Sequence, residues 1–311
     1  MDSAATESPV EYPAVRSLID NPVTVKELRS RMRGRRAFVV LTIYLLLMSL
    51  FILLVYLVYA AAARNSFGPG GRQAGKAVFG AVLAVEMFLV LFVGPAFTSG
   101  AISGEKERRT YDLLRTTLLP ARALVSGKLL SALSYVFLLI MVSVPLQSIA
   151  FLLGGVSPIE VLLSQLLVAL SAVSFALIGL YFSSLMRSTL TATIATFAAA
   201  MLMTFGLPMI AGIVGSVLGS FFFGGPSPGW FAEALLIYAG LLLAATNLPA
   251  TLIVSEVILL EEDALFFFSQ SVGGHTVTLF SPWFVYIFIY ILLALLLYWG
   301  CVRRVKRVPT K

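Results

Sequence analysis

Few residues of this chain combine the side-chain types and the spacing that catalysis or metal binding requires. The 311 residues include one histidine, His275, and one cysteine, Cys301, which excludes an internal disulfide and a metal site built on Cys and His pairs. An enzyme acting inside a membrane would need a nucleophile and a base, or metal ligands, that face each other. The apolar runs hold one clear acid, Glu86, and no histidine. We therefore expect no catalytic residue, no metal site and no enzymatic activity in this chain.

The segment from Gly70 to Lys76 fits the GxxxxGK pattern of a phosphate-binding loop. Its context argues against ATP binding, because alanine stands at position 77, where a Ser or Thr should bind magnesium, and no strand precedes it. We interpret the segment as a flexible glycine-rich turn. Any ATP hydrolysis is expected to come from another chain.

Glu86 lies inside an apolar run, about 14 Å from its start at 1.5 Å per helical residue. An unpaired carboxylate at that depth costs several kcal/mol, so Glu86 should face protein or water. Two interpretations stay open: it lines a translocation path, or it forms a structural hydrogen bond to a neighbouring helix. Glu256 is a weaker case of the same kind, and both acids could be protonated.

The most charged segment of the chain is the loop 100–128. Seven charges fall within eleven residues: Glu105, Lys106, Glu107, Arg108, Arg109, Asp112 and Arg115. A loop that only joins two helices could be much shorter, whereas this one combines both charge signs with Leu113 and Leu114 on a short predicted helix. Such a surface suits docking; a solvated turn is the simpler alternative.

These residues sit in a chain whose composition is that of a membrane protein. Hydrophobic residues make up 59% and charged residues 12%, and the mean hydropathy is +0.97, far outside the soluble range. Six runs have the ~20 mainly apolar residues that a spanning helix needs. They are 37–63, 77–99, 129–153, 161–185, 190–222 and 283–302. We predict an all-α polytopic membrane protein with six transmembrane helices in a transmembrane domain over 37–302.

The distribution of basic residues predicts the orientation of these spans. With the amino terminus in the cytoplasm, 19 of the 22 basic residues are cytoplasmic and only Arg64, Arg72 and Lys76 are outside. Both termini, including the tail 303–311, are then cytoplasmic. The membrane is expected to be a plasma membrane. The net charge of +7 does not indicate nucleic-acid binding, because the positive charges flank the spans.

The apolar stretch 230–260 would be a seventh span if it were one helix, and the basic tail would then lie outside. Asn247, Leu248 and Pro249 interrupt it, and each half, at about 22 Å, is shorter than the ~30 Å membrane core. We predict a re-entrant or interfacial helical hairpin, entered from the outside. The seven-span arrangement is the alternative. The aromatic residues beyond it resemble an interfacial belt: Phe266, Phe267, Phe268, Phe280, Trp283 and Tyr286.

Two further segments precede the first span. Residues 1–20 are expected to be a disordered cytoplasmic lead-in. In 21–36, Asn21 can cap a helix that begins at Pro22, and its apolar side is surrounded by basic residues. This pattern predicts an amphipathic helix in the cytoplasmic interface, acting either as an anchor of the first span or as a contact for a cytosolic partner.

The sequence from Glu105 to Thr110, followed by Leu113-Leu114, Thr116-Thr117, Pro120 and Gly127-Lys128, resembles the loop between spans two and three of type-2 ATP-binding-cassette (ABC) transporter permeases. Asn21-Pro22-Val23 and Lys26-Glu27-Leu28-Arg29 resemble the first helix of the same permeases. Arg109 stands where glycine is common in that family, and Tyr111 where leucine is common.

The resemblance implies a transmembrane subunit that pairs with a second permease, identical or homologous, and binds two cytosolic ABC ATPase subunits. No nucleic acid is expected as a partner. ATP and magnesium would bind the partner, and no cofactor would bind this chain. An exporter is the expected type. The coupling residues would be Glu105, Lys106, Glu107, Arg108, Arg109, Thr110, Asp112, Leu113 and Leu114, and the interface helix would use Asn21, Pro22, Lys26, Glu27, Arg29 and Arg33. An ATP-independent membrane carrier or scaffold is the alternative.

Overall fold

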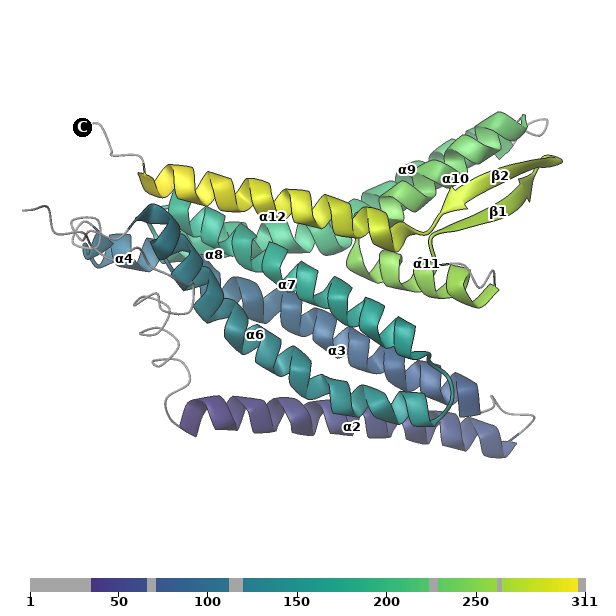
Figure 1. Ribbon diagram of the computed structural model, residues 1–311, viewed down its shortest axis with the longest axis horizontal. Coiled ribbons are helices and arrows are strands. Elements are labelled where there is room, and N and C mark those ends of the chain that lie inside the picture. Colours follow the sequence, from purple (N-terminus) through teal and green to yellow (C-terminus); the bar gives the residue numbers. More distant parts are fainter. Residues whose placement is uncertain (1–34, 66–70, 112–119, 224–228, 262–264, 307–311) are drawn as a thin grey trace, which may run out of the picture.

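The computed structural model describes residues 35–65, 71–111, 120–223, 229–261 and 265–306. In this part of the chain, six helical segments are long and apolar enough to cross a membrane, which confirms the predicted multi-pass, mainly helical class (Figure 1). The unbroken spans are α2 (Arg35–Asn65), α3 (Gly71–Ser99), α6 (Ala121–Leu152), α7 (Pro158–Leu185) and α12 (Pro282–Lys306). The remaining span is formed by α8 (Thr189–Met201), the π-helical turn η1 (Leu202–Gly206) and α9 (Leu207–Phe223).

Shorter elements lie at both ends of the bundle. The helix α4 (Ser103–Glu107) lies at the end where α12 finishes, and α10 (Trp230–Ala244) and α11 (Leu248–Glu261) lie towards the other end (Figure 1). The segment 230–260 is thus two short helices, as its central break predicts, and not a seventh continuous span. Whether the pair enters the membrane stays a prediction.

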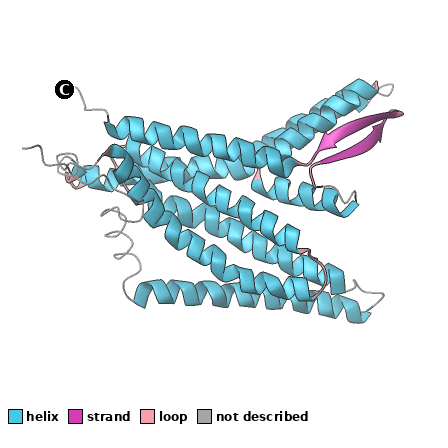
Figure 2. Cartoon of the chain, in the orientation of Figure 1, coloured by secondary structure: helices cyan, strands magenta, loops and turns pink. Residues whose placement is uncertain are grey.

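The fold is mainly helical, in agreement with the predicted all-α class, but it also contains one short β-hairpin that was not predicted. Strands β1 (Phe267–Val272) and β2 (His275–Phe280) form an antiparallel hairpin, the magenta pair in Figure 2. Gly273 and Gly274 make its two-residue turn with φ of 56° and 85°, values that glycine adopts without steric cost. The aromatic residues 266–268 and 280 therefore belong mainly to a hairpin. Tyr286 is fully buried, so its assignment to the interfacial aromatic belt was wrong.

The starts of the helices follow local sequence signals. At α7, Ser157 Oγ accepts from the amide of Glu160, the Glu160 carboxylate accepts from the amide of Ser157, and Pro158 occupies the first turn. The helix α3 begins at Gly71, six residues before the predicted span, so most of the predicted flexible turn is helical. A Cβ at Gly75 would lie 2.8 Å from the carbonyl oxygen of Ala150, which explains a glycine here: α3 and α6 touch through their main chains.

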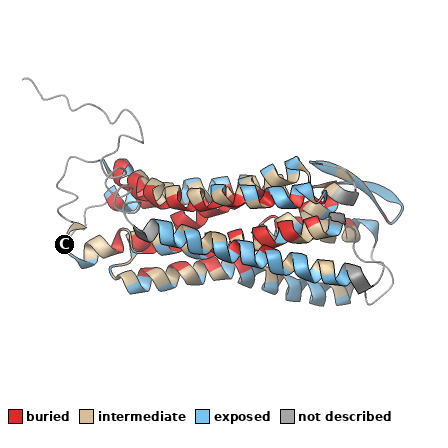
Figure 3. Cartoon of the chain, turned by 90° about the horizontal axis from the view of Figure 1, so that it is seen from below, coloured by how far each residue is buried: buried red, intermediate tan, exposed pale blue. Residues whose placement is uncertain are grey.

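The helix α3 is the centre of the bundle and contacts α2, α6, α7 and α8. Buried residues gather where the helices face one another, and exposed residues cover their outer sides (Figure 3). The helices α3 and α7 approach each other closely at Gly179, where a Cβ would lie 2.1 Å from Thr98 Oγ1 and 3.2 Å from the amide nitrogen of Ser99. Thr98 is one residue before the end of α3, so this contact sets the position of the chain that leads into α4.

The π-helical turn in the fifth span has a specific partner in the break between α10 and α11. Asn247 Nδ2 donates to the carbonyl oxygens of Thr204 at 2.7 Å and Met203 at 3.3 Å, while its Oδ1 accepts from the amide of Ala250. The wider π turn leaves main-chain carbonyls that need a donor. Asn247 therefore joins the short helix pair to the fifth span.

Candidate functional site

The helix α4 is held at its start by a side chain from α7. The amides of Ile102 and Ser103 donate to the hydroxyl of Ser183, at 2.8 and 2.9 Å, and both serines are fully buried. The first amides of a helix lack partners within it. Here a hydroxyl 80 residues away along the chain supplies the cap, so α4 cannot leave α7 without exposing these donors.

Lys106 attaches α4 to the end of α7. Its ammonium group donates to the main-chain carbonyls of Ser184 and, at 3.1 Å, of Met186, the residue that ends α7. The carboxyl end of a helix carries partial negative charge on its free carbonyls. A lysine at this position both satisfies these carbonyls and stabilises the helix dipole.

Glu107 makes the complementary contact with α8. Its Oε2 accepts from the amide of Thr189 at 3.3 Å and from the Thr189 hydroxyl at 2.7 Å. Thr189 is the first residue of α8, where the helix dipole favours an acid. Adjacent residues of opposite charge on α4 therefore bind the end of one span and the start of the next.

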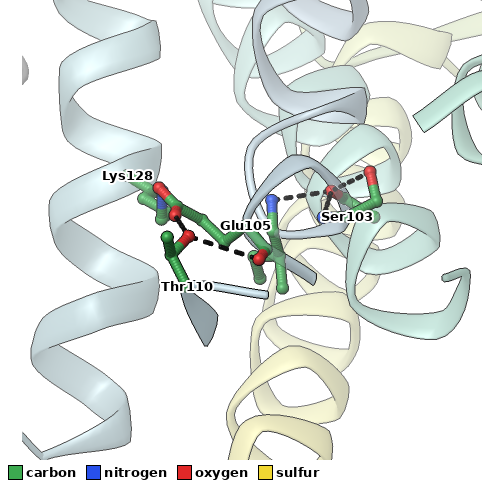
Figure 4. A network of polar contacts seen from close by, with 6 residues as sticks. Ser103, Glu105, Thr110 and Lys128 are labelled. Atoms are coloured by element: carbon green, nitrogen blue, oxygen red, sulfur yellow. Dashed lines mark hydrogen bonds and ion pairs between the residues drawn. The ribbon is translucent and has the colours of Figure 1, made fainter. Parts of the chain in front are cut away.

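Glu105 faces the third side of this site. One of its oxygens accepts from Thr110 Oγ1, and the other lies 3.7 Å from the ammonium nitrogen of Lys128 on α6 (Figure 4). Lys128 is 5% exposed and the Glu105 side chain 32%, so the pair joins a buried ammonium group to a carboxylate at the surface. Together the acid and base residues 105–107 connect α4 to α6, α7 and α8.

The turn after α4 is a tight main-chain motif. The amide of Thr110 donates to the carbonyl of Glu105 at 3.0 Å, and the amide of Arg109 donates to that of Lys106 at 3.1 Å. This pair of hydrogen bonds is a Schellman motif, whose residue after the cap adopts the left-handed conformation. That residue is Arg109, with φ of 58°, the one described non-glycine residue with a positive φ. The position where the resembled family commonly has glycine is thus one where glycine is sterically favoured.

An open polar hollow lies beside α4. It has a volume of about 360 Å³ and is lined by Gly100, Ala101, Gly104, Glu105, Glu107, Arg108 and Thr189. Arg108 and Arg109 are exposed, in contrast to Lys106. Among the described residues, the hollow and these two arginines form an exposed part of the predicted coupling surface.

The other predicted contact residues lie outside the described part of the chain. These are Asp112, Leu113 and Leu114 of the loop, and Asn21, Pro22, Lys26, Glu27, Arg29 and Arg33 of the interface helix. Of the predicted coupling residues, the structure describes those from Glu105 to Thr110.

A second polar group surrounds Glu86 in the middle of the bundle. Glu86 is fully buried on α3, and its carboxylate accepts from Ser143 Oγ, from Gln147 Nε2 at 3.0 Å and from Gln165 Nε2 at 2.9 and 3.1 Å. Ser143 and Gln147 belong to α6 and Gln165 to α7. Glu86 thus makes hydrogen bonds to two neighbouring helices, which was one of its two interpretations; the lining of a translocation path stays a prediction.

A third polar site lies near the end opposite α4. A narrow cavity of about 30 Å³ between α3, α7 and α11 is lined by residues that include Glu160, Ser164, Ser255 and Glu256. The ammonium nitrogen of Lys76 lies 3.7 Å from a carboxylate oxygen of Glu256. Burial raises the pKa of the Glu256 carboxyl, and the nearby Lys76 ammonium opposes that rise.

Sequence reasoning missed the partners of both polar groups. Ser183 and Thr189 carry no signal of their own, because serine and threonine are common near helix ends. Gln147 and Gln165 did carry one, since an amide inside an apolar run requires a partner. Among the described residues, no group of three or more His, Cys, Asp and Glu side chains is placed to hold a metal ion.

The chain was also compared with known proteins. No protein-family model matches it, and no curated protein matches it in a sequence search. A functional interpretation therefore depends on the residues and geometry described above.

Proposed function

We propose that this chain is the transmembrane permease subunit of an ABC transporter, and that α4 receives the movement of a cytosolic ATPase. The observation that carries the proposal is the attachment of α4: Lys106 and Glu107 bind the adjoining ends of α7 and α8, while Arg108 and Arg109 face outward. The motif that resembles the family's coupling segment coincides with this element.

The attachments of α4 suit mechanical transmission. A load on an unattached loop would only bend the loop, whereas α4 is joined to α7 through Ser183 and Lys106 and to α8 through Glu107. Movement of α4 by an ATPase would shift the corner between these two spans. The resulting change in helix packing would open or close a path between two permease subunits, in the direction of export.

The distribution of charge supports a cytoplasmic position for this end. Described basic residues at the α4 end include Arg108, Arg109, Arg122, Arg187 and Arg303, whereas Lys76 is near the other end. Cytoplasmic segments carry an excess of Lys and Arg. We place both termini in the cytoplasm and the protein in a plasma membrane, with a second permease as its membrane partner. ATP and magnesium belong to the ATPase in this proposal.

An ATP-independent carrier is the second candidate, because the polar group around Glu86 lies inside the bundle. A buried carboxyl with amide and hydroxyl neighbours is the kind of site that ion-coupled carriers use. This candidate needs no soluble partner. It would be favoured by transport in a purified system containing this chain alone.

The first test is purification of the tagged protein from its native membrane in mild detergent, with mass spectrometry of the proteins that accompany it. The proposal expects a soluble ATPase in stoichiometric amount. Its reproducible absence, with the permease intact, would favour the carrier.

A variant pair then tests the docking surface. Reversing both exposed arginines, R108E with R109E, should abolish ATPase binding and leave membrane insertion intact, because neither side chain is buried. The matched control is R303E with K306E on α12, which makes the same charge change at the same end of the bundle at exposed positions. Equal loss in both pairs would indicate attraction to positive charge in general and contradict a specific role of α4.

A further inference from the structure

The carboxylate of Glu86 occupies the middle of its span. It is 15 residues after the first residue of α3 and 13 before the last, which places it about 20 Å from either end of the helix at 1.5 Å per residue. Its side chain has no exposed surface. At this depth an ionised carboxylate is stable only if nearby groups compensate its charge.

The described surroundings compensate that charge incompletely. Hydrogen bonds from Ser143, Gln147 and Gln165 reach the carboxylate, but among the described residues no Lys, Arg or His forms an ion pair with it. Neutral donors reduce the cost of burying a charge without cancelling the charge. One positive charge would neutralise the ionised carboxylate of Glu86.

The same residues also present oxygen atoms without partners. Gln147 Oε1, Gln165 Oε1 and the Tyr44 hydroxyl are buried and make no hydrogen bond in the described part of the chain. Tyr44 belongs to α2, which packs against α3 and α6, the helices that carry Glu86 and Ser143. Buried oxygen atoms without partners are rare in proteins, and these three belong to residues next to one buried carboxylate.

The glutamine amides can present either donors or acceptors to the carboxylate. A half-turn of a glutamine amide exchanges Nε2 with Oε1 in nearly the same place. With both amides turned, Gln147 and Gln165 would offer carbonyl oxygens beside the two oxygens of Glu86. In the arrangement described here the amides donate to the free carboxylate; in the turned arrangement they complete an oxygen shell.

We propose that Glu86, Gln147 and Gln165, with Ser143 and Tyr44, form a binding site for one monovalent metal cation of the sodium or potassium class. Carboxylate, amide and hydroxyl oxygens are the ligands of hard cations. A monovalent ion neutralises the single carboxylate. A divalent ion would leave a buried net charge of +1 on the site, which costs as much as the charge it removes.

The narrow cavity near the far end of the bundle is lined by neighbours of the residues of this site. It is lined by Leu83, one helical turn before Glu86, and by Ser164, the neighbour of Gln165, with Glu160 and Glu256 among its other walls. Its volume of about 30 Å³ is enough for a water molecule, and the buried Ser255 hydroxyl against it lacks a partner among the described residues. Of the two acids, Glu256 is paired with Lys76, and Glu160 caps the start of α7. The proposal concerns the bundle alone and does not depend on an ATPase partner.

The test is equilibrium binding of radioactive sodium to the purified full-length protein in lipid nanodiscs, with choline as the balancing cation and unlabelled sodium or potassium as competitor. We expect saturable binding of one ion per chain and a higher unfolding temperature in sodium or potassium than in choline. The competitor that displaces the label at lower concentration identifies the preferred ion.

Three variants make the test specific. E86Q keeps the shape of the side chain and should lose the binding and the cation-dependent rise in unfolding temperature. Q165L keeps the carboxylate and should weaken binding by about tenfold or more, the typical effect of losing a group around a metal. E233Q makes the same substitution as E86Q at an acid of α10 outside the site and should bind like the unaltered protein. Absence of saturable binding in the unaltered protein, or equal binding by E86Q and E233Q, would overturn the proposal.

Discussion

The ammonium group of Lys106 donates a hydrogen bond of 3.1 Å to the carbonyl oxygen of Met186. The five-residue helix α4 is thereby bound to the end of the span α7. The next residue, Glu107, accepts from the first residue of the following span. The two contacts place α4 across the corner between α7 and α8. A local surface element is thereby made part of the transmembrane structure.

Replacing Lys106 with methionine should release α4 from α7. The change leaves two carbonyls without their charged donor, and we expect a loss of about 2 kcal/mol in the free energy of unfolding. Amide hydrogen exchange of residues 103–107 should become faster, while exchange in the middle of α3 stays slow. K306M, the same change at an exposed lysine near the end of α12, is the control. Equally slow exchange of α4 in K106M would show that the lysine is not its main attachment.

Replacing Arg109 with glycine should stabilise the protein. A non-glycine residue in the left-handed conformation costs roughly 1 kcal/mol, and glycine removes that cost. We expect a higher unfolding temperature for R109G. R108G is the matched comparison, because Arg108 has a φ of −80° and ends α4, where glycine gains nothing. If R109G lowers the unfolding temperature, the Arg109 side chain makes a contact that outweighs the relief of strain.

R109G also separates stability from docking. If Arg109 contacts an ATPase, the glycine variant will be more stable and will bind that partner less tightly. The two measurements should therefore move in opposite directions. A variant that is more stable and binds as before would remove Arg109 from the docking surface.

The spans could be predicted because their signal is local. A run of apolar residues long enough to cross a membrane is legible without any knowledge of its neighbours, and the predicted runs agree with the helices to within eight residues at each end. The break at Asn247 was also predictable, since Pro249 stands two residues later. The reason for the break was not, because the partner of Asn247 is the π-helical turn some 40 residues earlier.

The β-hairpin was missed although it carried a signal. Gly273-Gly274 between residues that favour strands indicates a two-residue hairpin turn. The surrounding aromatic residues were interpreted instead as a membrane belt, and this assignment concealed the alternation. Tyr286 was placed in the same belt, but it points inward and its hydroxyl lies 2.6 Å from that of Ser171.

The sequence does not show which charged side chains of this loop contact the spans and which stay exposed. All the charges from Glu105 to Arg109 look equally suited to a partner, and which of them turn inward depends on where α7 and α8 end in space. The pairing of Glu86 with Gln147 and Gln165 has the same origin. Polar residues inside apolar runs can be recognised from the sequence, but the packing of the helices determines which of them contact each other.

A larger residue at Gly179 should disturb the contact of α3 with α7. In G179A the added methyl group would lie 2.1 Å from Thr98 Oγ1 and 3.2 Å from the amide of Ser99, so both helices must move. We expect a loss of about 1–3 kcal/mol, the usual cost of overpacking. G212A is the control, since a Cβ there has no neighbour within 4 Å. The unfolding temperatures of the two variants in the same detergent give the comparison, and equal values would mean that Thr98 turns aside without cost.

The amide of Asn247 should be essential for the connection between the short helix pair and the fifth span. N247D keeps the shape and the acceptor for the Ala250 amide but loses the donor to the carbonyls of Thr204 and Met203. Two buried carbonyls without a donor beside an acidic oxygen should cost about 2–4 kcal/mol. T246A, at the neighbouring position, removes only a hydrogen bond to the carbonyl of Leu243 within its own turn and should cost less than half as much. Thermal unfolding measures the loss, and faster amide exchange around residue 204 in N247D, but not in T246A, would locate it at the π-helical turn; unchanged exchange there would mean that the turn is stable without Asn247.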